Sequence, residues 1–233
     1  MGYIRTRTYS TTRTTRTTKN IVKSTATGIG TGIQKNPLKN TNFTVKTNTS
    51  KSTVLNILES GKGPLKNGVS KPVAVARVDG PHVNAPYNHI NTNPKLYPNN
   101  KVYQALNHKP ISNSTYNIAK NFDKIGKIAK VSGRALTGLA IAADAVDIYD
   151  SYKSDGNKIG KNTVVTSSGV AGSWIGAIGG AQVGASGGAA IGTAVAPGLG
   201  TLIGGAAGGI IGGITGSITG RQGGEAIAKK LYD

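Results

Sequence analysis

The chain has 233 residues and a net charge of +19, and it contains 34 glycines but only 2 phenylalanines, 1 tryptophan and 1 methionine. Large apolar side chains do most of the burying in a soluble core, so this composition argues against one large compact core. The absence of cysteine excludes disulfide scaffolds, cysteine-ligated zinc, iron–sulfur clusters and cysteine nucleophiles.

Residues 1–71 are predicted to be a disordered basic tail and linker. The first 58 residues carry ten basic and no acidic side chains, are rich in threonine, and bury too little apolar surface to offset the entropy of ordering. No apolar segment typical of a signal peptide follows the start. We expect the basic residues of this tail to contact anionic lipid, namely Arg5, Arg7, Arg13, Arg16 and Lys19. The alternative is a solvated tail that binds no lipid.

Residues 72–112 are rich in proline and asparagine, which predicts loops or short β structure, with one alternating strand at 72–78. Residues 113–156 predict an amphipathic helical region, capped by Asn113 or Ser114. Its apolar positions recur every three or four residues, and the intervening lysines are further expected lipid contacts: Lys120, Lys124, Lys127 and Lys130. The alternative is a helix that packs on the preceding loop region.

An acidic set follows within the same helical region. Asp144, Asp147 and Asp150 share one helical face. We interpret them as a solvated face, or as an acidic set that is protonated at low pH.

Residues 157–233 predict a glycine-zipper helical hairpin of the transmembrane type. No charged residue occurs from Asn162 to Gly220, and glycine recurs at every fourth position in two series separated by a Pro197-Gly198 turn. These are the residues that we expect to pack helices in a membrane or oligomer: Gly172, Gly176, Gly180, Gly184, Gly188, Gly192, Gly200, Gly204, Gly208, Gly212, Gly216 and Gly220.

The spacing and length of the two series favour a membrane. Glycine weakens a soluble helix by about 1 kcal/mol per residue relative to alanine, whereas in lipid it lets two helices approach closely. Each series rises about 30 Å, close to the hydrocarbon thickness of a bilayer. Because a four-residue ridge winds around the helix, we expect one zipper to need more than one partner helix, which favours oligomers. Trp174 is expected to anchor one end at the interface. The alternative is a soluble glycine-rich hairpin.

Residues 134–233 resemble the glycine-zipper module at the C-termini of bacterial polymorphic toxins of the LXG type. The resemblance rests on five stretches, which are Gly133-Arg134-Ala135-Leu136, Asp144 to Tyr149, Gly160-Lys161-Asn162-Thr163, residues 170–177 and Gly224-Glu225-Ala226-Ile227. It implies pore formation or ion leakage, secretion or delivery to a target membrane, and an immunity or carrier protein as partner. The basic tail departs from the helical delivery domain of that family.

No sequence motif indicates an enzyme. Asp79, His82 and His89 suggest a nuclease or metal site, but the spacings between the three histidines, the last of which is His108, match no zinc pattern, so we expect a structural role in loops. We expect no catalytic residue, metal or cofactor. The sequence therefore favours a mostly helical, membrane-active homo-oligomer that binds anionic bilayers. The alternatives are a basic interaction protein that binds nucleic acid or acts as a scaffold and, third, a small nuclease-type toxin.

Overall fold

The computed structural model describes residues 3–232, and their side chains from Thr17 onward. The chain divides into two compact units. Unit 1 comprises residues 1–35, 132–184 and 209–233, and unit 2 comprises residues 36–131 and 185–208. The helices within residues 3–232 are α1 Tyr3–Ile33, η1 Pro94–Leu96, α2 Lys101–Ala105, α3 Asn113–Lys120, α4 Phe122–Ser154, α5 Lys161–Val195 and α6 Leu199–Lys230.

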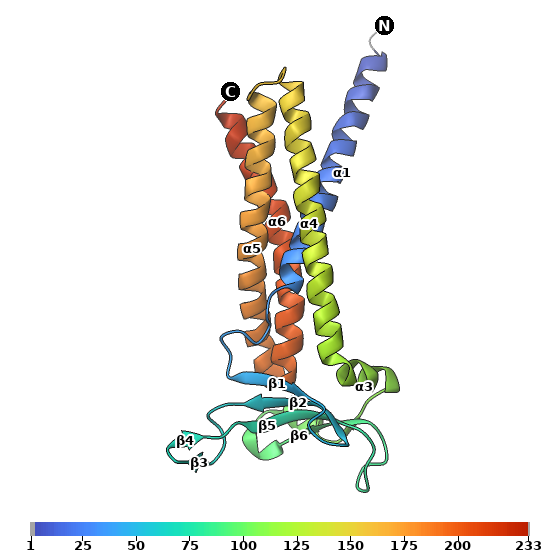
Figure 1. Cartoon of the computed structure of the whole chain (residues 1–233), viewed down its shortest axis with the longest axis vertical. Helices are drawn as coiled ribbons and strands as arrows, with labels where there is room; N and C mark the ends of the chain where they lie inside the picture. The colour runs from blue at the N-terminus through green and yellow to red at the C-terminus, as the bar shows by residue number, and fades with distance from the viewer. Residues whose placement is uncertain (1–2, 233) are drawn as a thin grey trace. The chain divides into compact units, whose positions relative to one another are not determined.

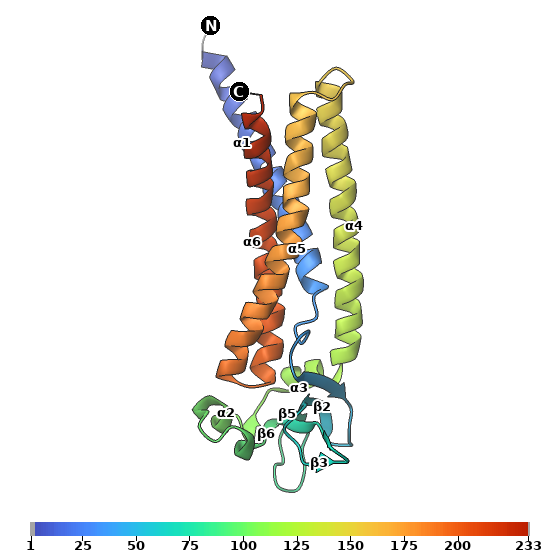
Figure 2. The same ribbon diagram turned by 90° about the vertical axis from the view of Figure 1, so that its left-hand side faces the viewer.

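Unit 1 is helical. Parts of α1, α4, α5 and α6 run side by side in it (Figures 1 and 2).

The predicted helical hairpin is confirmed, since α5 and α6 are joined by a turn at Pro197–Gly198, where Gly198 has a φ of 81°. The predicted helical region 113–156 is also confirmed, although Asn121 separates α3 from α4 and Ser112, not Asn113 or Ser114, caps α3 by accepting from Thr115 N at 3.1 Å.

Unit 2 is built on an antiparallel sheet in the order β1-β2-β5-β6-β7, and β3 pairs with β4 apart from it. The strands within residues 3–232 are β1 Phe43–Thr47, β2 Thr53–Glu59, β3 Leu65–Lys66, β4 Val69–Ser70, β5 Val73–Asp79, β6 His89–Thr92 and β7 Lys109–Pro110. The predicted strand over 72–78 corresponds to β5. The expectation of little β structure is wrong, because the apolar residues of β2 and β5 pair into the centre of the sheet.

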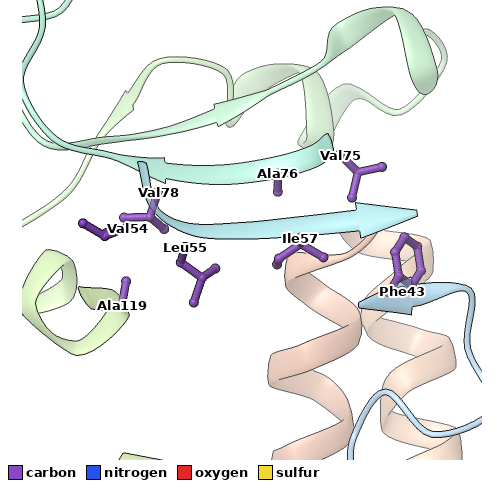
Figure 3. Close-up of a cluster of buried hydrophobic side chains, with 8 residues drawn as sticks. All are labelled: Phe43, Val54, Leu55, Ile57, Val75, Ala76, Val78 and Ala119. Atoms are coloured by element: carbon purple, nitrogen blue, oxygen red, sulfur yellow. The ribbon is translucent and has the colours of Figure 1, made fainter. Parts of the chain in front are cut away.

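The core of unit 2 is of the ordinary soluble kind. Figure 3 shows apolar side chains from β1, β2, β5 and α3 gathered in one cluster. Ile57 and Val75 in it are fully buried. The α5–α6 turn contacts the same cluster: a Cβ on Gly198 would lie 2.8 Å from Val75 Cγ2 and 3.0 Å from Ile57 Cγ2. Position 198 therefore favours glycine for two reasons, which are the positive φ and the close approach of the Val75 and Ile57 side chains.

The prediction of a disordered segment over 1–71 is wrong from Thr17 onward. Ser24, Thr27 and Gly28 of α1 are buried in unit 1, and β1 and β2 carry core residues of unit 2. The reason is packing between segments far apart in sequence, which composition does not report. Residues 1 and 2 lie outside the described part, as do the side chains of residues 3–16.

A carboxylate caps the start of α5. Gly156 and Asn157 take positive φ values of 76° and 58°, which turns the chain after α4, as the sequence predicts. Asp155 then accepts hydrogen bonds from the backbone N–H of Asn162 at 3.2 Å and from the backbone N–H and hydroxyl of Thr163 at 2.7 Å each. Desolvation raises the pKa of Asp155, but these hydrogen bonds outweigh it and lower the pKa to about 2.

We predict that Thr163→Val raises the pKa of Asp155 toward its ordinary value, because the variant removes the hydroxyl donor. A depressed carboxyl pKa contributes stability that is complete above about pH 4 and is lost as the pH falls toward about 2. The variant should therefore lose less stability than the parent over that range. Carboxyl ¹³C NMR titration measures the pKa, with Ser154→Ala as a control at the end of α4. An unchanged pKa in Thr163→Val would contradict the assignment.

Candidate functional site

The two glycine series face each other across the antiparallel α5–α6 hairpin. In unit 1, Gly172 pairs with Gly220, Gly176 with Gly216, and Gly180 with Gly212. In unit 2, Gly188 pairs with Gly204, and Gly192 with Gly200. Gly184 lies beside Gly212, and Gly208 beside Gly188. One register, stepping by four residues along each helix, therefore describes the contact in both units.

The approach of the two backbones leaves no room for a methyl group. At each of the five pairs, a Cβ on either glycine would lie less than 3.0 Å from the carbonyl oxygen of the other, which is closer than real Cβ atoms come. The Cα hydrogen therefore points at that oxygen, in the arrangement of a weak Cα–H···O contact. The premise that no single neighbour can cover the winding ridge is wrong, because the two ridges have the same period and wind together. The expectation that one zipper helix touches more than one partner helix is confirmed for α6, which also meets α1.

A second stripe of small residues on α6, one position on from the zipper, faces α1. It runs at every fourth residue through Gly209, Gly213 and Ser217 to Arg221, all of them buried. On α1, Gly28 packs against the backbone of Gly213 and Ile214, and Gly32 packs against that of Gly209. In unit 1, α6 therefore contacts both α5 and α1 through backbone, and both partners belong to the same chain.

A polar network fills the interior of unit 1 where α1, α4, α5 and α6 meet. Arg221 on α6 and Asp144 on α4 form a buried ion pair at 2.6 Å, and their side chains are each 4% exposed. Arg221 Nε also donates to Ser24 Oγ at 3.0 Å, and Trp174 Nε1 donates to Asp144 Oδ2 at 2.9 Å. Ser173 Oγ lies 2.7 Å from Ser217 Oγ. These hydrogen bonds offset the cost of burying two charges.

The network corrects two sequence-based expectations. Asp144 does not lie on a solvated face, because it is paired with Arg221 inside the bundle, whereas Asp150 is exposed as expected. Asp147 is half-buried and pairs with Lys23. The indole N–H of Trp174 donates to Asp144, and the expected place of this residue at a membrane interface stays a prediction.

The helices of unit 1 place small and polar residues inside and large apolar residues outside. The buried apolar side chains described in this unit are Val165 and four alanines, which are Ala140, Ala177, Ala181 and Ala228. By contrast, Ile175 and Val183 are each 73% exposed, and Leu139 is 67% exposed. A soluble domain has the opposite arrangement, with large apolar side chains inside. Unit 2 of this chain has that arrangement around its sheet. The exterior of unit 1 therefore suits an apolar surrounding.

The lysines expected to contact lipid are on the surface. Lys19 in unit 1 and Lys120, Lys124, Lys127 and Lys130 in unit 2 are all exposed. Ile118, Ile125 and Ile128, on the same stretch of α3 and α4, are also exposed, while Ala119 and Phe122 pack on the sheet core. The alternative of a helix packed on the preceding region is thus correct for one face only. The side chains of Arg5, Arg7, Arg13 and Arg16 lie outside the described part.

We predict opposite effects for alanine at two neighbouring glycines of α5. Gly176→Ala should destabilise the helical unit by about 1–3 kcal/mol, because its methyl group meets the carbonyl of Gly216. Gly179→Ala should stabilise it by up to about 1 kcal/mol, because no described atom lies within 4 Å of the new Cβ and alanine favours the helix. Circular dichroism melts in detergent compare the two. Equal effects would contradict the close contact.

We predict that Arg221→Met destabilises unit 1 by about 3–5 kcal/mol, because it leaves the buried charge of Asp144 without its cationic partner. Adding Asp144→Asn should recover much of the loss. The control is Lys229→Met, whose ion pair with Glu225 at 3.7 Å is more exposed and should contribute at most about 1 kcal/mol. Denaturant titration in detergent measures all three. A loss in Arg221→Met no larger than in the control would show that the pair is dispensable.

A comparison with known protein families supports the glycine zipper. A family model described as "C13G5.2-like, glycine zipper domain" matches residues 156–219. No curated protein and no solved structure is detectably similar to the chain. Among the described residues one helix, α6, is long and apolar enough to cross a membrane. The matched segment covers the end of the α4–α5 connection, all of α5 and most of α6, so this chain contains a glycine-zipper module.

Proposed function

We propose that the protein inserts its helical unit into membranes and permeabilises them, as a pore-forming or ion-leak effector. The single observation that carries this proposal is the reversed arrangement of unit 1, with charge and hydroxyl groups inside and isoleucine, leucine and valine outside. In water such a surface is a liability. In a bilayer it removes apolar side chains from water while the buried polar groups keep their partners.

The charge pattern supports capture by anionic lipid before insertion. The exposed lysines of α3 and α4 lie among exposed isoleucines, which is the composition of a helix that binds at a membrane surface. Each basic side chain near an anionic surface contributes about 1 kcal/mol of attraction. The basic residues of α1 add to the same attraction, from Arg5 to Lys19.

The permeabilising step that we propose requires self-association. The glycine ridges of α5 and α6 are used within the chain, so a second copy would pack against the remaining faces. One such face of α5 carries small exposed residues, which are Ala171, Gly179 and Gly187. Small residues let a second helix approach closely, and the exposed isoleucines would add apolar contact. A ring of copies that encloses the less apolar faces of these helices would let ions pass. An immunity or carrier protein would then be needed to protect the producing cell.

We predict that Gly180→Leu combined with Gly208→Leu abolishes dye release from vesicles that contain anionic lipid, because both changes separate the hairpin backbones. The matched control is Gly179→Leu combined with Gly187→Leu, at positions where no described atom lies within 4 Å of an added Cβ. The control should release dye as the parent does, or more weakly if these positions contact a second copy. Release from neutral vesicles should be lower throughout.

Two results would contradict the proposal. One is a Gly180→Leu, Gly208→Leu variant that releases dye as well as the parent. The other is a parent chain that binds no vesicles but binds duplex DNA with a steep dependence on salt, which would favour the basic interaction protein.

A further inference from the structure

Two histidines and an aspartate meet at one end of the sheet in unit 2. β5 ends at Asp79, the chain turns through a bridge between His82 and Ala85, and β6 begins at His89. Asp79 and His89 are paired across the two strands. One ligand-type atom from each of Asp79, His82 and His89 lies within 4.8 Å of the others.

The ring of His89 is buried with one nitrogen unused. The residue has 0% exposure, and its Nδ1 lies 2.9 Å from the carbonyl oxygen of Tyr87. That carbonyl can only accept, so Nδ1 is the donor, and in the neutral imidazole Nε2 then holds a lone pair. Nε2 has no hydrogen-bond partner among the described residues. A buried, unsatisfied acceptor is costly, and metal-binding histidines are held in the same way, with the other ring nitrogen bonded to a carbonyl.

The carboxylate of Asp79 is also held in place. It is 2% exposed, with Oδ1 accepting from Thr53 Oγ1 at 2.7 Å and Oδ2 accepting from Asn91 Nδ2 at 3.2 Å. Arg77 lies 3.3 Å from Oδ2 and balances part of its charge. Such outer contacts orient a metal-binding carboxylate, and Oδ1, which among the described residues accepts only from Thr53, keeps a lone pair for an ion.

We propose that Asp79, His82 and His89 bind a divalent transition-metal ion, with Zn²⁺ as the natural probe. Two imidazoles and one carboxylate suit zinc and its neighbours, whereas calcium and magnesium prefer oxygen ligands alone. Bonds of about 2.0–2.1 Å require ligand atoms about 3.3 Å apart. The ligand atoms therefore have to move closer together when an ion binds, and we expect half-buried His82, which lies on the turn, to make that movement. Three protein ligands leave a tetrahedral ion one position for water.

The test is Zn²⁺ and Co²⁺ binding to the untagged full chain in a non-chelating detergent, by calorimetry and by the visible spectrum of bound Co²⁺. The parent should bind, should show a tetrahedral-type Co²⁺ spectrum, and should unfold at a higher temperature with Zn²⁺ than with chelator. His82→Ala and His89→Ala should each weaken binding by at least about tenfold and remove the spectrum.

The control is His108→Ala. The ring of His108 stacks on that of His89 with centroids 5.2 Å apart and an angle of 14° between the rings, but it is not among the clustered ligands. This variant should keep Zn²⁺ affinity and the Co²⁺ spectrum. If His89→Ala does not fold, His82→Ala decides the result, since its side chain lies on a turn. No Zn²⁺ binding by the parent, or binding kept by His82→Ala and lost by His108→Ala, would overturn the proposal. Vesicle release plays no part in this test, so its outcome is independent of the proposed function.

Discussion

The backbones of α5 and α6 approach so closely that a single methyl group does not fit between them at five glycine pairs. Such a contact gains little from the hydrophobic effect, because glycine has no side chain to remove from water. It gains from dispersion and from weak Cα–H···O contacts along the whole ridge. Both helices therefore have to keep glycine at every fourth position, and their large side chains have to lie on the other faces. The apolar exterior of unit 1 follows from this constraint.

The remaining faces of α6 determine the rest of unit 1. Its second small-residue stripe receives α1, and the same stripe ends in Arg221, which is thereby directed into the bundle toward Asp144. A buried pair of this kind adds little stability by itself, but it fixes which helices meet and at what level, since one partner is on α6 and the other on α4. In a bilayer a mismatched arrangement would leave a bare charge in hydrocarbon, which is far more costly. The zipper therefore provides close packing, and the ion pair provides the choice of neighbour.

The hairpin could be predicted from the sequence because its signal is local: one residue type at one helical spacing, ended by Pro197-Gly198. Contacts that join distant segments of the chain have no such local signal. A series of small or polar residues at every fourth position also occurs in α1, at Asn20, Ser24, Gly28 and Gly32, but it is hard to see among the threonines and basic residues. Its partner is α6, nearly 200 residues later in the chain. Arg221 continues the four-residue spacing of Gly213 and Ser217, but as a charged residue directly after the uncharged segment it looks like the end of a membrane span. His82 and His89 match no zinc spacing, yet strand pairing brings His89 beside Asp79. Register across a sheet is set by tertiary packing, and sequence separation does not report it.

The contrast between the two interiors has a thermodynamic consequence. The heat capacity of unfolding grows with the apolar surface that becomes exposed. Unit 2 buries Phe43, Leu55, Ile57 and Val75, and its stability should curve with temperature as it does for ordinary domains. Unit 1 buries glycine, alanine, serine and an ion pair, so its unfolding should change the heat capacity little for its length. The two parts of one chain would then respond differently to cooling, since the apolar core of unit 2 loses part of its driving force whereas unit 1 keeps most of its own.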